Sequence, residues 1–364
     1  MLIQCTKKLV DELKIVPGKP SDEEEPLLSW HANLLKIGRH KFIVLVNDAN
    51  RYAIVLYGLK AKDKKNIEKL IVNAVREVFQ AESIEEQIID GYLQKSEALS
   101  FGKTKDRKLV ARLNKACEWV HYGEDYWDPG EIVQVGMSKW ISSLLVGDGN
   151  KDYIHPNEEM YKDLQEFSGQ PIFNTEALVL KVTLKLDHHS VWRRITVPAN
   201  ITFTELHDIV QAAFAWQNSH LHDFEIYEKN EDGSVRQEYP NLRLVCDEAF
   251  SSESEIPVKM ETGQKLKGVL PAKIIYNYDY GDNWKHTIEV ERVIHDYTFN
   301  YPICEDGEGS VPPEDVGGQP GFDGFLDIIN DPNHPDHEQM KEWGEMQGYE
   351  DFDLRDINMR LKRG

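Results

Sequence analysis

The stretch Tyr276–His286 reads Y-N-Y-D-Y-G-D-N-W-K-H, and the second half of the chain is organised around it. Strand-type residues alternate up to Tyr280, a Gly-Asp-Asn break follows, and Trp284 opens a second alternating run. Alternation with period two on both sides of a short polar break predicts a β-hairpin. Its turn would need positive φ angles, which Gly281 and Asn283 adopt most easily.

Three polar residues of this stretch, Asp279, Asp282 and His286, would gather near one end of the hairpin. Carboxylates and imidazoles in one cluster can bind a metal ion or carry acid–base chemistry. The same groups can instead tie a turn by accepting hydrogen bonds from nearby backbone N–H groups. The hairpin alone leaves both interpretations open.

Chain length and charge limit the number of domains and the kinds of partner that can be expected. The chain has 364 residues, which is too long for one ordinary core and predicts two or three domains. Up to Tyr126 there are 21 Lys and Arg against 19 Asp and Glu, whereas the rest has 21 against 44, a net charge of −23. Such an acidic segment repels phosphate backbones, so we do not expect the second half to bind nucleic acid directly.

The cysteines indicate a reducing compartment. They are isolated, with no C-x-x-C spacing, which argues against a disulfide framework or a zinc ribbon. The chain does not open on a recognisable signal peptide, and no apolar run approaches the ~20 residues of a membrane span. We therefore expect a cytoplasmic protein with no membrane contact.

The first half predicts a sheet followed by helices. Strand-forming runs separated by polar turns indicate a short first strand and an antiparallel meander, at 2–5, 27–35, 41–46 and 52–57. Apolar residues at helical spacing predict helices over 62–80, 83–93, 106–120 and 157–167. Ser83 and Glu86 have the spacing of a capping box. Residues 132–145 are ambiguous between strand and helix.

The chain divides near Ser168-Gly-Gln-Pro171, which has the composition of a linker. We predict a first domain at 1–167, in which 126–167 either closes the domain or bridges both, a linker at 168–176 and a second domain at 177–364. Strands and helices of the second domain are predicted at 177–186, 205–215, 225–227, 321–330, 335–343 and 353–361. The expected fold class is α+β, with a mainly antiparallel or mixed sheet and packed helices in each domain.

The second half contains several short motifs whose order and spacing match those of a known protein family. They are W-R-R-I (192–195), A-F-A-W (213–216), S-H-L-H-D-F (219–224), Y-D-Y-G-D-N-W-K-H (278–286), P-P-E-D-V-G-G (312–318) and D-P-N-H-P-D-H-E (331–338). Over about 174–362 this half resembles the plasmid pRiA4b ORF-3-like family, first noted on plasmids and seen as passengers of insertion elements. The resemblance implies a compact α+β domain and brings no established catalytic mechanism.

One loop departs from that family. Members often have cysteines flanking the P-P-E-D segment, where this chain has Val311 and Val316, and only Cys304 remains nearby. A metal site built from thiolates of that loop is therefore not expected here.

The first half has its own motifs, C-T-K-K-L (5–9), S-W-H-A-N-L (29–34) and K-F-I-V-L-V-N (41–47). Over about 1–125 they resemble a bacterial domain-of-unknown-function family, which implies no activity. His31 could be a metal ligand, but no second ligand stands at metal spacing, so a structural role is the favoured interpretation.

A candidate site joins two motifs of the second half. His220 and His222 are two residues apart, so on a strand they would share a face, as pairs of imidazoles that bind one ion often do. With Asp279, Asp282 and His286 they would form a site suited to Zn, Mn or Fe.

Glu314 or Asp315 would join this site as a general base. In the alternative interpretation the cluster is a structural network, where His220 bonds a backbone carbonyl and Asp282 closes an Asx turn. Arg193 and Arg194 form a basic cluster that would hold a phosphate or, more in keeping with the acidic surroundings, an internal carboxylate.

Two functions remain open. The first is a binding or interaction module with no cofactor, an accessory of mobile elements or of defence against them, whose unidentified protein partner would dock in grooves beside Trp216 and Trp284. The alternative is a hydrolase of phosphorylated or nucleotide substrates that uses a divalent Zn or Mn ion. A weaker third possibility is mimicry of nucleic acid by the acidic half. No P-loop, dinucleotide-binding, nucleophile-elbow or H-E-x-x-H motif occurs.

Overall fold

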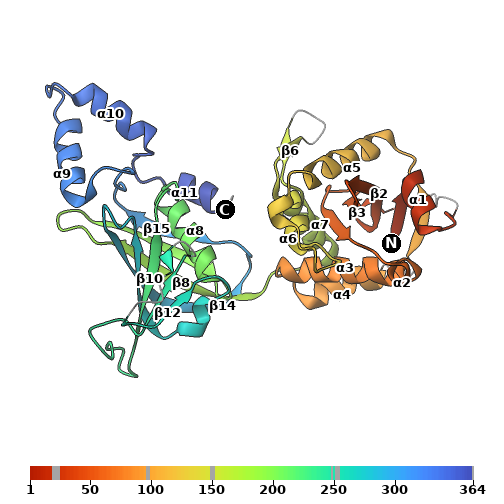
Figure 1. Cartoon of the computed structure of the whole chain (residues 1–364), viewed down its shortest axis with the longest axis horizontal. Coiled ribbons are helices and arrows are strands. Elements are labelled where there is room, and N and C mark those ends of the chain that lie inside the picture. Colours follow the sequence, from red (N-terminus) through yellow and green to blue (C-terminus); the bar gives the residue numbers. More distant parts are fainter. Residues whose placement is uncertain (19–24, 96–98, 148–151, 247–248, 251–254, 363–364) are drawn as a thin grey trace. The chain divides into compact units, whose positions relative to one another are not determined.

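The computed structural model describes residues 1–18, 25–95, 99–147, 152–246, 249–250 and 255–362. The chain forms two compact units, Met1–Asn174 and Thr175–Gly364, each with a hydrophobic core of its own (Figure 1). Both units are α+β, with helices packed on a mixed sheet. Within the described ranges, no helix is both long and apolar enough to cross a membrane.

The first unit contains a five-stranded sheet of order β4-β3-β2-β1-β5, in which β1 runs parallel to β2 and β5. The predicted meander is confirmed as β2, β3 and β4, which pair antiparallel. The strands are β1 (Leu2–Cys5), β2 (Ser29–Ile37), β3 (His40–Asn47), β4 (Ala53–Tyr57), β5 (Ser100–Lys103), and a separate pair, β6 (Val146–Gly147) and β7 (Tyr153–Ile154). The sequence did not predict β5, whose four residues depend on pairing with β1.

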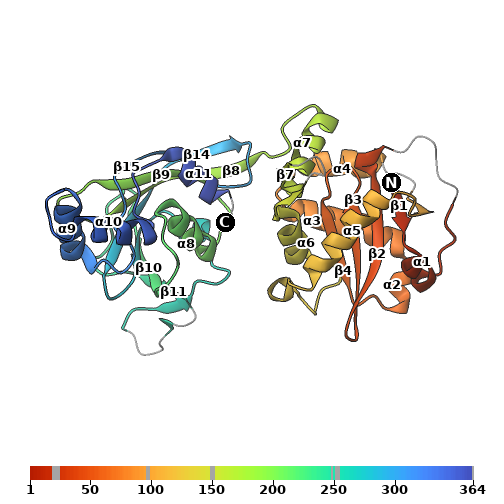
Figure 2. The same cartoon turned by 90° about the horizontal axis from the view of Figure 1, so that it is seen from above.

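Helices cover both faces of this sheet (Figure 2). One face packs against α3, α4 and α7, and the other against α5 and α6. The helices are α1 (Lys7–Leu13), α2 (Ala61–Lys65), α3 (Ile67–Ala81), α4 (Glu86–Lys95), α5 (Arg107–Val120), α6 (Val135–Ser143) and α7 (Pro156–Ser168), with short 3-10 turns at Pro26–Leu28 and Glu124–Tyr126. Ser83 is not a helix cap: it has a φ of 62°, and α4 begins only at Glu86.

The junction between the units is shorter than the predicted linker. Helix α7 ends at Ser168 and is capped by Gly169, which has a φ of 69°. Ile172 and Phe173 then bury their side chains in the core of the first unit. Because Thr175 already begins β8, most of the 168–176 segment belongs to one unit or the other.

The second unit has an eight-stranded sheet of order β12-β11-β10-β13-β14-β8-β9-β15. Its neighbours pair antiparallel, except β11 and β12. The strands are β8 (Thr175–Leu184), β9 (Val191–Pro198), β10 (His222–Glu228), β11 (Leu242–Val245), β12 (Val258–Met260), β13 (Ala272–Tyr278), β14 (Trp284–Tyr297) and β15 (Ile303–Glu308). The predicted hairpin is confirmed as β13 and β14, at the centre of the sheet.

The helices of the second unit are α8 (Phe203–Ala213), α9 (Gly318–Ile329), α10 (His337–Met346) and α11 (Leu354–Leu361), with a 3-10 turn at Leu266–Val269. Helix α8 packs its apolar side on the sheet and begins at a capping box, in which Thr202 and Glu205 bond each other's backbone N–H. Helix α11 packs on α8 and β15, and α9 packs on α10 (Figure 1). The loop before α9 contains the P-P-E-D-V-G-G motif.

Candidate metal centre

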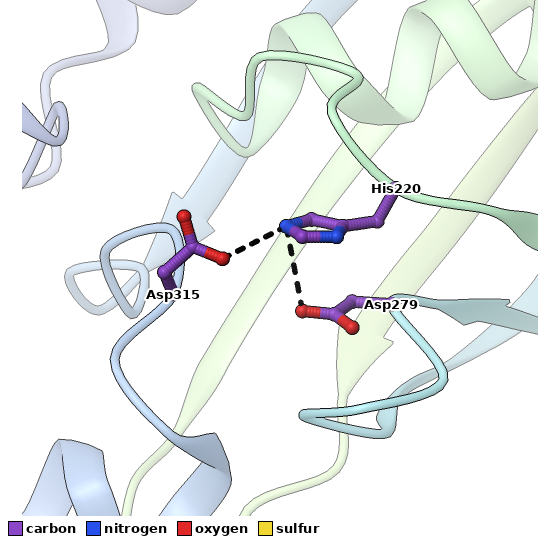
Figure 3. A group of neighbouring side chains, drawn as sticks. All are labelled: His220, Asp279 and Asp315. Carbon is purple, nitrogen blue, oxygen red and sulfur yellow. Dashed lines mark ion pairs between the residues drawn. The ribbon is translucent and has the colours of Figure 1, made fainter.

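The side chain of His220 is surrounded by carboxylates from two other loops (Figure 3). Its Nε2 atom lies 3.0 Å from Asp315 Oδ1, 3.6 Å from Asp279 Oδ2 and 3.7 Å from Glu314 Oε2. His220, Asp279 and Asp315 each offer one ligand atom, and these atoms all lie within 4.8 Å of one another. The structure thus brings the S-H-L-H-D-F, Y-D-Y-G-D and P-P-E-D motifs together at one point.

The loop that carries His220 is fixed between α8 and β10. Ala215 and Asn218 adopt left-handed backbone conformations, with φ of 56° and 53°, which turn the chain back toward the sheet. Trp216 anchors the loop, because its Nε1 donates a hydrogen bond to the Pro312 carbonyl. The same bond joins this loop to the P-P-E-D segment.

Glu314 is held with one oxygen engaged and the other turned toward His220. Its Oε1 accepts hydrogen bonds from the Gln217 backbone N–H at 2.8 Å and from the Tyr278 hydroxyl at 2.9 Å. Burial, and then the bond to Glu314, raise the pKa of Tyr278, so its hydroxyl keeps its proton and acts as a donor. Tyr278 was not among the predicted site residues, although its alternation with Tyr276 puts both rings on one face of the strand.

Asp279 both ties the hairpin turn and faces His220. Its backbone has a φ of 54°, and its Oδ1 accepts hydrogen bonds from the backbone N–H groups of Gly281 and Asp282. Its Oδ2 is the atom that faces the imidazole. The turn prediction needs a correction: Asn283 has a positive φ, but the other such residue is Asp279 and not Gly281.

Asp282 does not face His220, since its Oδ2 accepts a hydrogen bond from the Gly317 backbone N–H at 3.0 Å. It thereby holds the P-P-E-D-V-G-G loop against the hairpin. The loop itself turns sharply at Asp315, with a φ of 56°, and at Gly317 and Gly318, with φ of 91° and 68°. These contacts place Asp315 where 63% of its side chain remains exposed, so the group opens to solvent on that side.

The structure does not form the predicted group of three imidazoles within the residues it describes. The Nε2 atom of His222 lies 2.9 Å from Glu261 Oε2. The His222 ring also stacks on the ring of His207, with 3.6 Å between the ring centroids. His286 is fully buried against Phe214 and Trp216, and burial lowers its pKa to about 3. His220 is therefore the one histidine of the three that faces the carboxylates.

The two tryptophans predicted to line a recognition groove are in the core. Trp216 is 7% exposed and Trp284 is 2% exposed, and their rings stack at 6.3 Å. Trp216 also stacks on Tyr278 at 4.9 Å. Their role is to support the loops around His220, and neither offers a surface to a partner.

The two arginines of W-R-R-I have separate roles. Arg193 is buried and donates hydrogen bonds to the carbonyls of Ala213, Trp192, Glu308 and Gly309. Burial lowers its pKa to about 10. Arg194 forms the internal salt bridges that were expected, with Glu291 and Asp306. Neither arginine is left to bind an external phosphate.

Comparison with known proteins agrees with these motifs. Residues 176–360 match the model of the plasmid pRiA4b ORF-3-like protein family, over half of the chain. The chain belongs to that family. Residues 2–159 match a domain of unknown function, DUF6933. Both resemblances inferred from the sequence are thereby confirmed.

Relatives of this pRiA4b ORF-3-like chain are uncharacterised. It is 32% identical over 184 residues to the uncharacterized protein y4hQ of Sinorhizobium fredii, covering 50% of this chain and 87% of the relative. The chain is also similar to the crystal structure of a protein of unknown function, MM3350 from Methanosarcina mazei Go1, with 29% sequence identity and a TM-score of 0.41. The match covers 50% of this chain and 96% of the MM3350 chain. The cysteine next to the family loop, Cys304, is buried, which raises the pKa of its thiol to about 11 and disfavours a thiolate ligand.

Proposed function

We propose that the C-terminal domain binds a divalent metal ion through His220, Asp279 and Asp315. The observation that supports this is the state of His220 Nε2, a buried nitrogen that makes no hydrogen bond although three carboxylate oxygens surround it. Ligands bound at about 2.0–2.2 Å from one ion lie about 3–3.5 Å from each other. The distances of 3.0 and 3.6 Å from Nε2 to the two aspartates are close to that range.

The donor set favours metals of intermediate hardness. One imidazole with carboxylate oxygens suits Zn, Mn or Fe, whereas a thiophilic ion would need cysteine. Three carboxylates around one point also repel each other, and a divalent cation relieves that repulsion. Glu314, which is 3% exposed, would act as a further ligand or as a hydrogen-bond acceptor for a bound water.

The test is a metal analysis of the untagged full-length protein, followed by titration of the chelated protein with Mn²⁺ and Zn²⁺ in a calorimeter. We expect about one ion per chain, and an affinity at least tenfold lower in His220→Ala and in Asp279→Asn. His295→Ala is the matched control, since His295 is 81% exposed on β14. Absence of bound metal together with absence of titration heat would overturn the proposal.

The hydrolase prediction extends this proposal. Because Asp315 is largely exposed, an ion held by these side chains would be accessible to water, and Glu314, whose Oε2 faces His220, would act as the general base toward such a water. The metal-loaded protein is then expected to hydrolyse p-nitrophenyl phosphate or nucleotides, and Glu314→Gln to lose turnover. A metal-loaded protein with no turnover on either would contradict hydrolysis while leaving metal binding intact.

The role as an interaction module stays a prediction. It rests on the family resemblance, but the burial of Trp216 and Trp284 removes the surface that was predicted for a partner. Any protein partner must therefore use another surface.

A further inference from the structure

Four aromatic side chains of the N-terminal domain gather where α5 ends. They are Trp119 in the last turn of α5, Tyr122 two residues after that helix, Tyr126 in a 3-10 turn and Trp140 in α6. The rings of Tyr126 and Trp140 stack, with centroids 4.9 Å apart and planes 14° apart. Trp119 contacts Trp140 and Tyr122 through ring edges, with 6.4 and 5.9 Å between centroids. We call these four side chains the aromatic cluster.

The outer side of the aromatic cluster is exposed. Tyr122 is 73% exposed and Tyr126 is 45% exposed, whereas two tyrosines of the domain core, Tyr52 and Tyr92, are fully buried. Trp140 covers one face of the Tyr126 ring, and among the described residues no second ring stacks on it. Exposed aromatic side chains that lie together mark interaction sites, while single exposed ones are common on any surface. Tyr126 is therefore available to stack with a planar group of another molecule.

The backbone around the cluster is held in place. A Cβ at Gly123 would lie 2.8 Å from the Trp140 ring, so only glycine fits at this step of the chain. Trp127, the residue after the 3-10 turn, packs inward on aromatic rings of β3 and β4. Gln134 is buried and bonds the backbone N–H and carbonyl of Asp128 through its side-chain amide. A partner that docks here would have little chain to order, which lowers the entropic cost of binding.

The surroundings of the aromatic cluster favour a cation. Residues 116–138 contain acidic side chains but neither Lys nor Arg, although the chain up to Tyr126 has a slight excess of basic residues. The acidic residues are all exposed, and they are Glu118, Glu124, Asp125, Asp128 and Glu131. Helix α5 ends at Val120, and the partial negative charge of a helix C-terminus acts in the same direction. An anionic partner such as nucleic acid would be repelled here.

Lys115 shows how this surface holds a cation. Its Nζ lies 5.2 Å from the centroid of the Trp119 ring and 2.9 Å from Glu118 Oε2. One aromatic ring and one carboxylate thus bind an ammonium group of the chain itself. Tyr126 offers the same combination, because Glu124 and Asp125 lie beside it in the 3-10 turn. Its own stretch of sequence supplies no Lys or Arg to occupy this second position.

We propose that the aromatic cluster docks an arginine-rich segment of a partner protein. A guanidinium group is planar and weakly hydrated, so it stacks on the Tyr126 ring while its N–H groups bond the carboxylates of Glu124 or Asp125. A lysine ammonium is more strongly hydrated and has no flat face to stack. An apolar helix would desolvate the carboxylates without giving them a counter-charge. This docking is independent of metal binding, which belongs to the other domain.

The probe is a fluorescein-labelled peptide of Arg-Gly repeats, titrated with the full-length protein and followed by fluorescence anisotropy. The buffer contains about 150 mM NaCl, which screens long-range attraction to the acidic domain. The same peptide with Lys or with Glu in place of Arg is the chemical control. We expect saturable binding of the Arg peptide, binding of the Lys peptide that is weaker by roughly fivefold or more, and no binding of the Glu peptide. Tyr126→Ala and Glu124→Gln are each expected to weaken binding of the Arg peptide by roughly fivefold or more.

The matched controls are Tyr239→Ala and Glu338→Gln, at exposed positions of the C-terminal domain, and both should leave the affinity unchanged. Tyr122→Ala is a further variant of the cluster that should also weaken binding, at a side chain too exposed for its loss to affect folding. The proposal is wrong if the Arg peptide does not bind saturably, if the Lys peptide binds equally well, or if the cluster variants and the controls bind alike. It is also wrong if the wild type dimerises in analytical ultracentrifugation and Tyr122→Ala does not, because a second copy of the chain would then cover the cluster.

Discussion

Acid should destabilise the C-terminal domain through two buried neutral histidines, His207 and His286. Burial lowers the pKa of His207 to about 4, and the neighbouring His222 contributes to the shift. Burial alone lowers the pKa of His286 to about 3. In the unfolded chain both imidazoles titrate near pH 6.5, so below that pH the unfolded state binds more protons than the folded state. Stability is therefore retained above pH 6.5 and lost as the pH falls from 6.5 toward 4.

The size of the effect follows from these values. Between pH 6.5 and pH 5 each histidine stays mostly neutral in the folded protein but becomes protonated in the unfolded chain. For each of them the free energy of unfolding therefore falls by about 1.4 kcal/mol per pH unit. Each histidine thus lowers the free energy of unfolding by about 2 kcal/mol at pH 5, and the two together by about 4 kcal/mol. That is a large part of the 5–15 kcal/mol that is typical of a domain.

The assay compares His286→Phe with the wild-type protein. Urea unfolding is followed by hydrogen exchange of peptides from β13 and β14, which report on this domain alone, at pH 7.5 and pH 5. The pH-dependent loss of unfolding free energy should be about 2 kcal/mol smaller in His286→Phe, because Phe can pack on Phe214 and Trp216 but cannot be protonated. His295→Gln, at an exposed position, should lose as much as wild type. An unchanged loss in His286→Phe would refute the reasoning, whatever the cost of the substitution at pH 7.5.

Two further predictions concern helix α9, which follows the loop of the site, and strand β9. Gly321→Ala is expected to lower the melting temperature and weaken Mn²⁺ binding, because a Cβ at this position would collide with the Val316 carbonyl oxygen. The control is Gly324→Ala, which has open space around the added Cβ and should be tolerated. Equal melting temperatures for the two variants would contradict this. Arg193→Met is expected to cost about 3 kcal/mol or more in urea unfolding, since four backbone carbonyls lose the buried guanidinium that donates to them, while Arg194→Met should cost about 1 kcal/mol or less. A similar small cost for both would show that Arg193 is not a structural anchor.

Local sequence patterns were sufficient to predict most helices and strands and part of the candidate site. The alternation around Tyr276–His286 predicted the hairpin, and the motif order identified the family. Asp279, Glu314 and Asp315 were predicted as site residues, and all three do face His220. Local hydrogen-bonding rules anticipated that an aspartate would tie the turn, but the Asx turn predicted at Asp282 is formed by Asp279, while Asp282 bonds the Gly317 backbone N–H.

The errors arose where distant segments decide the environment. Period two would put His222 on the same strand face as His220, but β10 begins only at His222, and His220 lies in the loop before it. Contacts from α8 and from Glu261 then determine what the His222 imidazole meets. Trp284 could be interpreted as a surface anchor because its neighbours in sequence are polar. It is buried because β14 lies between β13 and β8, with Trp216 stacked above it. No spacing within a motif contains that information.

The candidate centre draws His220, Asp279 and Asp315 from three chain segments that lie 59 and 36 positions apart. An ion shared by these side chains would act as a reversible cross-link that closes two long loops at once. Pairing of β10 with β13, in which His222 lies opposite Tyr278, already closes the loop between His220 and Asp279, so the ion would not have to overcome that loop's closure entropy. Such a centre would therefore be completed only after β10 and β13 have paired, and an opening of the P-P-E-D-V-G-G loop would release a bound ion without unfolding the sheet.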